Sequence, residues 1–531
     1  MLREIRNAVD KILKSMPFEK PLKYSVELPP SVFDADVSTN VALVLAKLLK
    51  KNPSVIAGDI ISELKKDENI SDAVFKSGFI NIKFSEKFIA QKLPDFLKNE
   101  GIAPQINFAG DKKILIEFVS ANPTGPLHIG HGRGAVYGDS LAGILKYLGA
   151  EVEKEYYVNN IGNQMELLAD SVMSYIEGSP LPENGYKGKY IEDIADKIKI
   201  SGEGLSKNEV KDFTINKILF WIEEDLKALG VRFAMWFEES SLYEHNEVES
   251  LIKILKEKGF AYEQDGAVWF KSTAFSDDKD RVIKRADGRY TYLASDIAYH
   301  CNKYRRGYDT MIDIWGADHH GYVGRMKGSM KALGFDENKL VIILYQLVNI
   351  IKNGQKVTMS TRAGEFINLR EVLDEVGPDA VRFFMLMRSS ESHLDFDLDL
   401  AKKQAPENPV FYVQYAHARI CSIFKEADKL NFKLPAAAGT GLLKLPEERS
   451  LIKNVFFFED LVETAARDFA PHYITKYLQD ISAEFHSYYN KARVITDDKD
   501  LSAARLQLCF AVRNVIKTGL LLLGISAPEK M

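Results

Sequence analysis

The feature that most constrains this chain is a short apolar strand followed by a glycine-rich turn and a helix. Residues 114–119 are apolar except for Glu117, a pattern typical of a strand buried in a parallel sheet. Pro123 and a run of glycines follow, and residues 135–148 have the apolar spacing of a helix. A strand, a glycine-rich turn and a helix in this order form the opening unit of a nucleotide-binding α/β fold.

The turn carries groups that suit a phosphate. Small residues allow a ligand to approach the backbone, and the start of the helix offers free N–H groups and the positive end of the helix dipole. His128 and His131 fall on one face, so both imidazoles can reach the same phosphate group. The alternatives are a structural histidine and a zinc site, but the HExxH glutamate and a third ligand are missing from the sequence.

The length of 531 residues allows about three domains. We expect a small mixed module over residues 1–105 and a Rossmann-like nucleotide domain over 106–395. A charged stretch at about 165–275 has helical character and is interpreted as an insertion in the nucleotide domain. Residues 396–531 have the spacing of several long helices and predict an all-helical domain.

Composition is that of a soluble globular protein, with 46% hydrophobic and 27% charged residues. Cys301, Cys421 and Cys509 are far apart and form no CxxC pair, which argues against a structural zinc site and a disulfide framework. The first residues have no signal-peptide core, and the apolar stretches are too short to span a bilayer. We therefore expect a cytoplasmic protein with no membrane partner.

The segment Ala121–His131 resembles the HIGH signature of class I aminoacyl-tRNA synthetases. The resemblance implies ATP and Mg²⁺ as a joint substrate, with no structural metal. It also implies that both histidines stabilise the charge that builds up when a carboxylate attacks the α-phosphate of ATP. The ATP-binding residues that it implies here are Pro123, Thr124, His128, Gly130 and His131.

Class I enzymes have a second, lysine-rich signature, KMSKS, and residues 356–364 stand at its position. Met359 and Ser360 match and are expected to bind ATP, whereas threonines replace both lysines. Loss of the second lysine resembles the arginyl-tRNA synthetases. Some members of that group have a lysine just before HIGH, but this chain has none there, so the cation that neutralises the leaving diphosphate stays open. Our hypothesis is Arg362, with Lys356 second.

A pocket for the planar, charged guanidinium of arginine needs carboxylates and an aromatic wall. Glu117 ends an apolar strand, where a carboxylate is costly unless it binds a ligand or forms an internal ion pair. Tyr292 and Asp296 share one helix face, although Asp296 could simply favour the helix dipole. The resemblance implies that these three residues face the guanidinium, and that Ser120 and Asn122 hold the α-amino and carboxylate ends. His319, after an apolar strand at 310–315, is expected to line the same cleft.

Three residues of the helical domain, Tyr412, Tyr415 and Arg419, share one helix face and could stack on and grip unpaired bases. The alternative is that both tyrosines belong to the core. The resemblance favours an anticodon-binding helix, and places Met531 near the anticodon loop. The N-terminal module resembles the domain that contacts the tRNA elbow. Asn81 and Phe84, on a strand expected at 78–84, are predicted to face RNA, with an ordinary alternating strand as the alternative.

The net charge of −5 argues against an RNA-binding protein when taken alone, but it is unevenly distributed. Residues 1–110 and residues 409–531 each carry 16 basic and 14 acidic side chains, and the segment between them has a net charge of −9. The acidic excess therefore lies where ATP and a cationic amino acid would bind. We expect RNA binding to depend on local patches and on stacking.

The resemblance implies an enzyme that attaches L-arginine to tRNA-Arg through arginyl-adenylate, acting as a monomer. Three alternatives remain: a cytidylyltransferase, which also uses an HxGH turn; a synthetase for glutamine or cysteine; and a tRNA-binding relative without catalysis. The long helical domain argues against the first, and the missing zinc ligands argue against a cysteine enzyme. The intact His128, Gly130 and His131 argue against the third.

Overall fold

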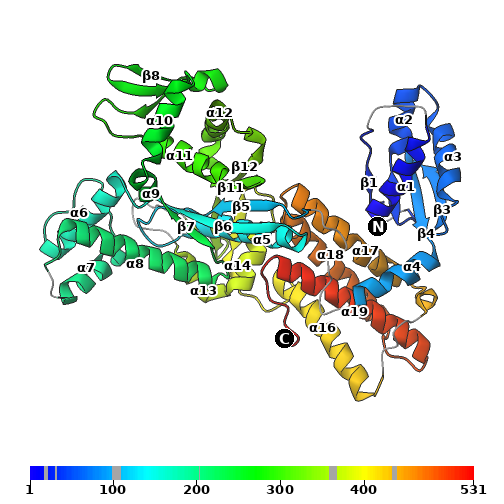
Figure 1. Ribbon diagram of the computed structural model, residues 1–531. Helices are drawn as coiled ribbons and strands as arrows, with labels where there is room; N and C mark the ends of the chain where they lie inside the picture. The colour runs from blue at the N-terminus through cyan, green and yellow to red at the C-terminus, as the bar shows by residue number, and fades with distance from the viewer. Residues whose placement is uncertain (17–21, 30–32, 98–108, 202–203, 358–366, 433–438) are drawn as a thin grey trace.

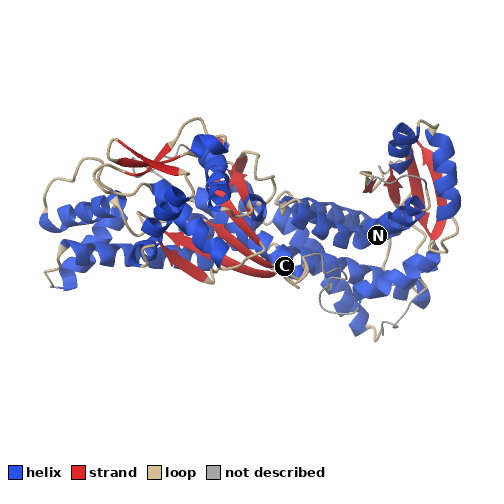
Figure 2. Ribbon diagram, turned by 45° about the horizontal axis from the view of Figure 1, so that its top comes forward, coloured by secondary structure: helices blue, strands red, loops and turns tan. Residues whose placement is uncertain are grey.

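The computed structural model describes the whole chain except residues 17–21, 30–32, 98–108, 202–203, 358–366 and 433–438. The molecule is elongated and has three parts. In space, the N-terminal module lies at one end, a helical domain lies in the middle, and a domain built on a parallel sheet lies at the other end (Figures 1 and 2). These parts confirm the predicted fold class.

The N-terminal module packs helices against a four-stranded antiparallel sheet with the strand order β1-β2-β4-β3. Its strands are β1 (Val26–Glu27), β2 (Val37–Thr39), β3 (Ile70–Lys76) and β4 (Phe79–Phe84). Its helices are α1 (Leu2–Lys14), α2 (Val41–Leu49) and α3 (Pro53–Leu64), and α4 (Glu86–Lys92) with the 3-10 turn η1 (Leu93–Leu97) leads out of it.

The central sheet of the nucleotide domain has five parallel strands in the order β12-β11-β5-β6-β7. They are β5 (Lys113–Phe118), β6 (Glu151–Val158), β7 (Met235–Glu238), β11 (Thr310–Gly316) and β12 (Leu340–Tyr345). From β5 the chain builds outward through β6 to β7, and then returns to add β11 and β12 on the other side. This reversal creates a switch point at the carboxyl end of β5, where ligands bind in open α/β sheets.

Two helices define the faces of this sheet near the switch point. Helix α5 (Ile129–Tyr147) packs so closely that a Cβ at Gly138 would lie 2.3 Å from the Phe118 ring. On the opposite face lie α11 (Tyr292–Arg305) and α12 (Val323–Leu333), with the 3-10 turns η3 (Ala317–Tyr322) and η4 (Glu337–Lys339) beside them. A separate buried cluster that includes Leu115, Ile297 and Met326 fills the α11 face.

The stretch at 165–275 is only partly helical. Helices α6 (Asn163–Glu177), α7 (Lys189–Ser201) and α8 (Lys207–Ala228) agree with the prediction, but β7 then rejoins the main sheet. After α9 (Glu239–Glu244) and α10 (Glu247–Glu257), the chain forms a small antiparallel sheet of β8 (Ala261–Gln264), β9 (Ala267–Phe270) and β10 (Arg281–Lys284), with η2 (Ser272–Phe275) between the last two. Asp265 and Gly266 both have positive φ, so this Asp-Gly pair forms a tight hairpin turn that was not recognised in the sequence.

A further small sheet, β14-β13-β15, closes the nucleotide domain, and four long helices form the C-terminal domain. The strands of this sheet are β13 (Val348–Lys352), β14 (Gln355–Val357) and β15 (Leu394–Asp397). The helices α13 (Leu369–Val376), α14 (Pro378–Met385) and α15 (Leu398–Ala401) belong to the same part of the chain. The long helices are α16 (Pro409–Lys429), α17 (Pro446–Arg467), α18 (His472–Lys491) and α19 (Lys499–Leu522), with the short turn η5 (Thr440–Leu442). No helix in the described part of the chain is long and apolar enough to cross a membrane.

Candidate active site

The turn after β5 has a strained backbone that its neighbours hold in place. Val119 and Ser120 have φ values of 69° and 38°, in the left-handed region that side chains other than glycine rarely adopt. The Ser120 hydroxyl donates to Glu117 Oε1 at 2.8 Å and accepts from the Tyr157 N–H at 3.1 Å. Such strain costs about 1–3 kcal/mol per residue and gathers at functional sites.

The two histidines cap the helix that follows this turn. His128 Nδ1 accepts from the Gly130 N–H at 3.1 Å, and His131 Nδ1 accepts from the His128 N–H at 3.3 Å. The rings are stacked with their centroids 3.6 Å apart. Because each Nδ1 is an acceptor, the proton of each neutral ring lies on Nε2, which can donate to a ligand. Burial lowers the pKa of both histidines, to about 3 for His131, so both rings are neutral at pH 7.

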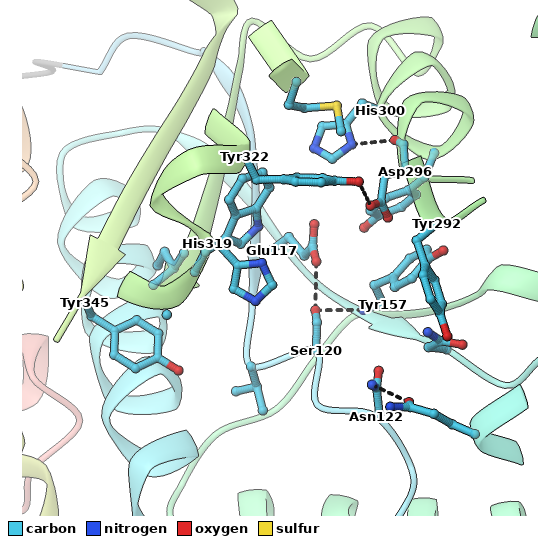
Figure 3. A pocket seen from close by; sticks show the side chains of 18 residues that line it. Glu117, Ser120, Asn122, Tyr157, Tyr292, Asp296, His300, His319, Tyr322 and Tyr345 are labelled. Carbon is cyan, nitrogen blue, oxygen red and sulfur yellow. Dashed lines mark hydrogen bonds between the residues drawn. The ribbon is translucent and has the colours of Figure 1, made fainter. Parts of the chain in front are cut away.

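A cavity of about 450 Å³ lies at the switch point, and all six residues predicted for the arginine pocket line it (Figure 3). These six are Glu117, Ser120, Asn122, Tyr292, Asp296 and His319. In Figure 3 Tyr292 and Tyr345 lie at opposite ends, with Glu117 between them. The structure thus brings together residues that are up to 202 positions apart in the sequence.

Asp296 and Glu117, the two carboxylates that line the cavity, have different surroundings. Asp296 Oδ2 accepts from the Tyr322 hydroxyl at 2.8 Å, and no cationic side chain among the described residues forms a salt bridge with it. Burial raises the pKa of Asp296, as expected for a carboxylate that has lost water without gaining a cation. Glu117 Oε2, in contrast, pairs with the Lys303 ammonium group, so the internal ion pair considered from the sequence is present.

The remaining predicted pocket residues lie toward the solvent. The Tyr292 side chain is 57% exposed, and that of His319 is 58% exposed, with Nε2 3.6 Å from Asp318 Oδ2. Asn122 donates to Gln164 Oε1 at 2.8 Å, which connects the turn to α6. These exposed side chains can adjust to a ligand more freely than the buried floor.

The predicted ATP-binding residues of the turn lie between the cavity and α5. Pro123 is buried, and the Thr124 carbonyl accepts from the Tyr190 hydroxyl at 2.9 Å. A Cβ at Gly130 would lie 3.0 Å from the His128 ring, a tight contact that would press on this ring. One turn further, Gly134 packs against the ring of Tyr345, which lines the cavity, and this contact brings the start of α5 next to the pocket.

The second signature is only partly described. Lys356 lies on β14 with an exposed side chain, opposite Ile351 of β13. Met359, Ser360 and Arg362 lie outside the described residues.

The three side chains of α16 that are predicted to face RNA lie close together. Arg419 donates to the Tyr415 hydroxyl at 2.8 Å and lies over the rings of Tyr415 and Tyr489. Tyr412 and Tyr415 both contact the His486 ring of α18. Both tyrosines are partly exposed rather than core residues, and Met531 is 48% exposed at the end of the tail that lies along α16.

The prediction for the N-terminal strand needs correction, because Asn81 and Phe84 are both buried. The Asn81 amide accepts from the Ser38 hydroxyl at 2.7 Å and donates to backbone carbonyls of the β3–β4 hairpin. Phe84 stacks on Phe88 at 4.2 Å. Because both side chains are covered by neighbouring residues of the module, neither presents itself to RNA.

Several pocket residues were not found from the sequence. Tyr157, His300, Tyr322 and Tyr345 line the cavity, and Lys303 lies below it. His300 and Lys303 stand four and seven positions after Asp296, so helical spacing could have assigned them to the same face. Tyr157 and Tyr345 lie near the ends of β6 and β12, and only the strand order shows that both line one cavity. No group of three or more potential metal ligands occurs among the described residues.

Comparisons with known proteins match the three parts in order. Residues 3–84 match the arginyl tRNA synthetase N-terminal domain, residues 92–391 the catalytic domain of class I (R) tRNA synthetases, and residues 413–531 the DALR anticodon binding domain. An arginine–tRNA ligase of Syntrophotalea carbinolica is 47% identical, covering 96% of this chain and 95% of that protein. One of Elusimicrobium minutum is 44% identical over the whole of both chains. The structure of Thermus thermophilus arginyl-tRNA synthetase, 23% identical, has the same fold over the full length of both, with a TM-score of 0.82.

Proposed function

The chain belongs to the arginyl-tRNA synthetase family, and on that premise we propose which of its residues attach arginine to tRNA. The carboxylate of arginine attacks the α-phosphate of ATP and gives arginyl-adenylate and diphosphate. The terminal ribose hydroxyl of tRNA-Arg then takes the arginyl group and AMP leaves. Neither step forms a covalent bond to a side chain, so the protein contributes positioning and charge stabilisation.

The observation that carries the assignment is an Asp296 carboxylate that forms no salt bridge with any described residue, in a cavity walled by Tyr157, Tyr292 and Tyr322. This arrangement suits a guanidinium, which combines a charge with planar faces. Glu117 contributes a second carboxylate to the floor of the same cavity. Ser120 and Asn122 lie at the strained turn, where they hold the α-amino and carboxylate ends, and His319 covers the open side.

ATP binds across the start of α5 in this proposal. The Nε2–H groups of His128 and His131 donate to phosphate oxygens, and these bonds strengthen as negative charge builds up in the transition state. Pro123, Thr124 and Gly130 shape the turn, and Met359 and Ser360 contribute from the second signature. Mg²⁺ enters with ATP as part of the substrate.

The cation for the leaving diphosphate is assigned to Arg362, with Lys356 as the second candidate. The assignment rests on the position of both residues in the segment that corresponds to KMSKS. An Arg362→Ala variant should form arginyl-adenylate more slowly in single-turnover experiments, and Lys356→Ala serves as the comparison. An unchanged rate in Arg362→Ala would remove Arg362 from the mechanism.

The tRNA anticodon stacks on the α16 face. The cluster of Tyr412, Tyr415 and Arg419 offers partly exposed rings beside a cation, which is the combination that binds unpaired bases. Met531 lies on the exposed tail along the same helix. The N-terminal module contacts the tRNA elbow through residues other than Asn81 and Phe84. The protein acts as a monomer in the cytoplasm.

The decisive experiment is ATP–pyrophosphate exchange with each amino acid, with and without tRNA, followed by charging of tRNA-Arg. Of the amino acids tested, only arginine should support exchange and charging. Exchange with glutamine or cysteine instead of arginine would overturn the substrate assignment, and a protein that binds tRNA without exchange or charging would have no catalytic function.

A further inference from the structure

Three carboxylates form a row beneath the arginine pocket. Asp313 on β11 and Glu155 on β6 both stand opposite Glu117 of β5 in the parallel register. All three side chains are buried and lie on the sheet face that α11 covers. Three adjacent carboxylates in a low-dielectric environment repel one another strongly, so each needs a cation nearby.

Helix α11 and its C-cap supply these cations. Lys303, with 0% of its surface exposed, pairs with Asp313 Oδ1 at 2.7 Å and with Glu117 Oε2. Arg306 donates to both oxygens of Glu155. Burial alone would lower the pKa of Lys303, but the negative charges of Asp313 and Glu117 hold it above its ordinary value.

His300 adds a further contact to this row. Its Nε2 lies 2.7 Å from Asp313 Oδ2, and its Nδ1 lies 2.7 Å from the backbone carbonyl of Asp296. The imidazole ring therefore connects the row to the start of α11, where Asp296 lies. Asp313 and Glu117 share Lys303, and Glu155 has Arg306, so each carboxylate of the row has a cation within hydrogen-bond distance.

The two carboxylates that line the pocket consequently have unequal roles. Glu117 is already neutralised from below by Lys303, and its Oε1 accepts from the Ser120 hydroxyl at 2.8 Å. Asp296 has only the Tyr322 hydroxyl, at 2.8 Å, and forms no salt bridge in the described part of the chain. An arriving guanidinium therefore gains most by pairing with Asp296.

We propose that Lys303 is a positioning residue that fixes Glu117 as a neutralised hydrogen-bond acceptor, and so leaves Asp296 as the ion-pair partner that selects a cationic substrate. The proposal rests on the proposed function, because it assumes that arginine occupies this cavity. The two carboxylates then have different roles. Asp296 recognises the positive charge of the substrate side chain, and Glu117 recognises its position. Lys303 itself does not touch the substrate.

The first test separates charge from position with citrulline, which replaces the guanidinium of arginine by a neutral urea group. The ratio of the citrulline inhibition constant to the arginine KM is measured by pyrophosphate exchange with tRNA present. Asp296→Asn should lower this ratio at least tenfold, whereas Glu117→Gln should change it less than threefold. A Glu117→Gln variant that lowers the ratio as much as Asp296→Asn overturns the proposal.

The second test addresses Lys303 directly. Lys303→Met should raise the arginine KM at least tenfold and leave the ATP KM within twofold, because only the arginine side of the site loses its fixed acceptor. The matched control is Lys253→Met, which replaces an exposed lysine of α10 and should change neither constant. An unchanged arginine KM, or an equal rise in both constants, overturns the positioning role.

Lys303→Met removes the ammonium group that the carboxylates of Glu117 and Asp313 share and can fail to fold. The double variant Lys303→Met/Asp313→Asn removes one of these charges and is then used for the same measurement. If both variants fail to fold, the citrulline ratio alone decides. Charging of tRNA-Arg by the wild-type protein is measured first, so a failure of the proposed function is distinguished from a failure of this proposal.

Discussion

At the scale of single residues, the structure determines the tautomers of the two signature histidines. Each Nδ1 accepts a backbone N–H of the first helical turn, so each ring presents Nε2–H outward. A neutral donor stabilises developing charge on phosphate without the desolvation cost of a buried imidazolium. Lysine or arginine cannot replace these rings, because neither has a nitrogen that accepts the capping bond.

His128→Ala should slow arginine activation by about 10²–10³-fold, because it removes both a donor to phosphate and the cap of α5. The tRNA KM should stay within twofold, since the anticodon face lies on α16. Steady-state charging at varied ATP and tRNA concentrations measures both. A comparable loss of tRNA affinity would contradict the assignment of His128 to the ATP side.

His131→Asn should make the protein less sensitive to acid. The folded-state pKa of His131 is about 3, because burial disfavours the charged ring, whereas the unfolded chain takes up its proton near pH 6.5. Above pH 6.5, His131 is neutral in both states and costs no free energy of unfolding. As the pH falls below 6.5, only the unfolded chain binds this proton, so the free energy of unfolding decreases. Between about pH 4 and 6, the variant should show a stability slope lower by up to about 1.4 kcal/mol per pH unit. Urea denaturation across this range measures the slope, and parallel curves for both proteins would contradict the prediction.

At the scale of elements, the approach of α5 to β5 depends on the absence of a side chain at one position. Gly138 faces the Phe118 ring, which is itself 1% exposed and cannot move outward. Because Phe118 directly precedes the strained turn, the same contact positions both the strand and the helix that flank the phosphate site.

Gly138→Ala should destabilise the protein by about 1–3 kcal/mol, because the new Cβ overlaps the Phe118 ring and forces the helix away. The matched control is Gly58→Ala in α3, where nothing lies within 4 Å of the added Cβ. The control should be neutral or stabilising by up to about 1 kcal/mol, since alanine favours a helix. Thermal denaturation compares the two, and an equal effect would contradict the packing argument.

Tyr415→Ala should raise the tRNA KM about fivefold or more, because stacking on one base contributes about 1–3 kcal/mol. Tyr415 also holds Arg419 in place, so both contacts are weakened together. Leu430→Ala, at the exposed end of the same helix, is the control and should leave charging unchanged. Equal charging by Tyr415→Ala and wild type at limiting tRNA would argue against an anticodon role for this face.

At the scale of the whole molecule, one buried arginine joins three parts of the chain. Arg382 of α14 donates to the Leu523 carbonyl after α19 at 2.7 Å and to the Leu229 carbonyl after α8 at 3.0 Å. It also pairs with Asp139 of α5 at 2.6 Å. The helical domain, the end of the insertion and the signature helix are therefore fixed relative to one another by a single guanidinium.

Arg382→Met should destabilise the folded chain by about 3 kcal/mol, because the Leu229 carbonyl loses its donor, and Asp139 and the Leu523 carbonyl keep only Lys154 and Ser140. Arg467→Met at the end of α17 is the control, since its half-exposed pair with Asp468 contributes at most about 1 kcal/mol. Differential scanning calorimetry measures both variants. Equal melting temperatures would show that Arg382 does not join these parts.

The sequence by itself determined the family, the order of the three parts and six of the residues that line the pocket. These features are local or periodic: the strand before Pro123, the paired histidines, and the helical spacing of Tyr292 and Asp296 can each be read within about a dozen residues. The hairpin at Asp265–Gly266 was equally local and was missed only because the surrounding stretch was interpreted as helical.

Only the tertiary structure decided how the pocket distributes its charges. Whether Glu117 is free or paired depends on Lys303 and Asp313, which lie 186 and 196 residues further along the chain and meet it through strand order and the packing of α11. The burial of Asn81 and Phe84 likewise depends on the place of β4 within its sheet. Spacing along a chain specifies which residues share a face, but electrostatic partners are set by what packs against that face.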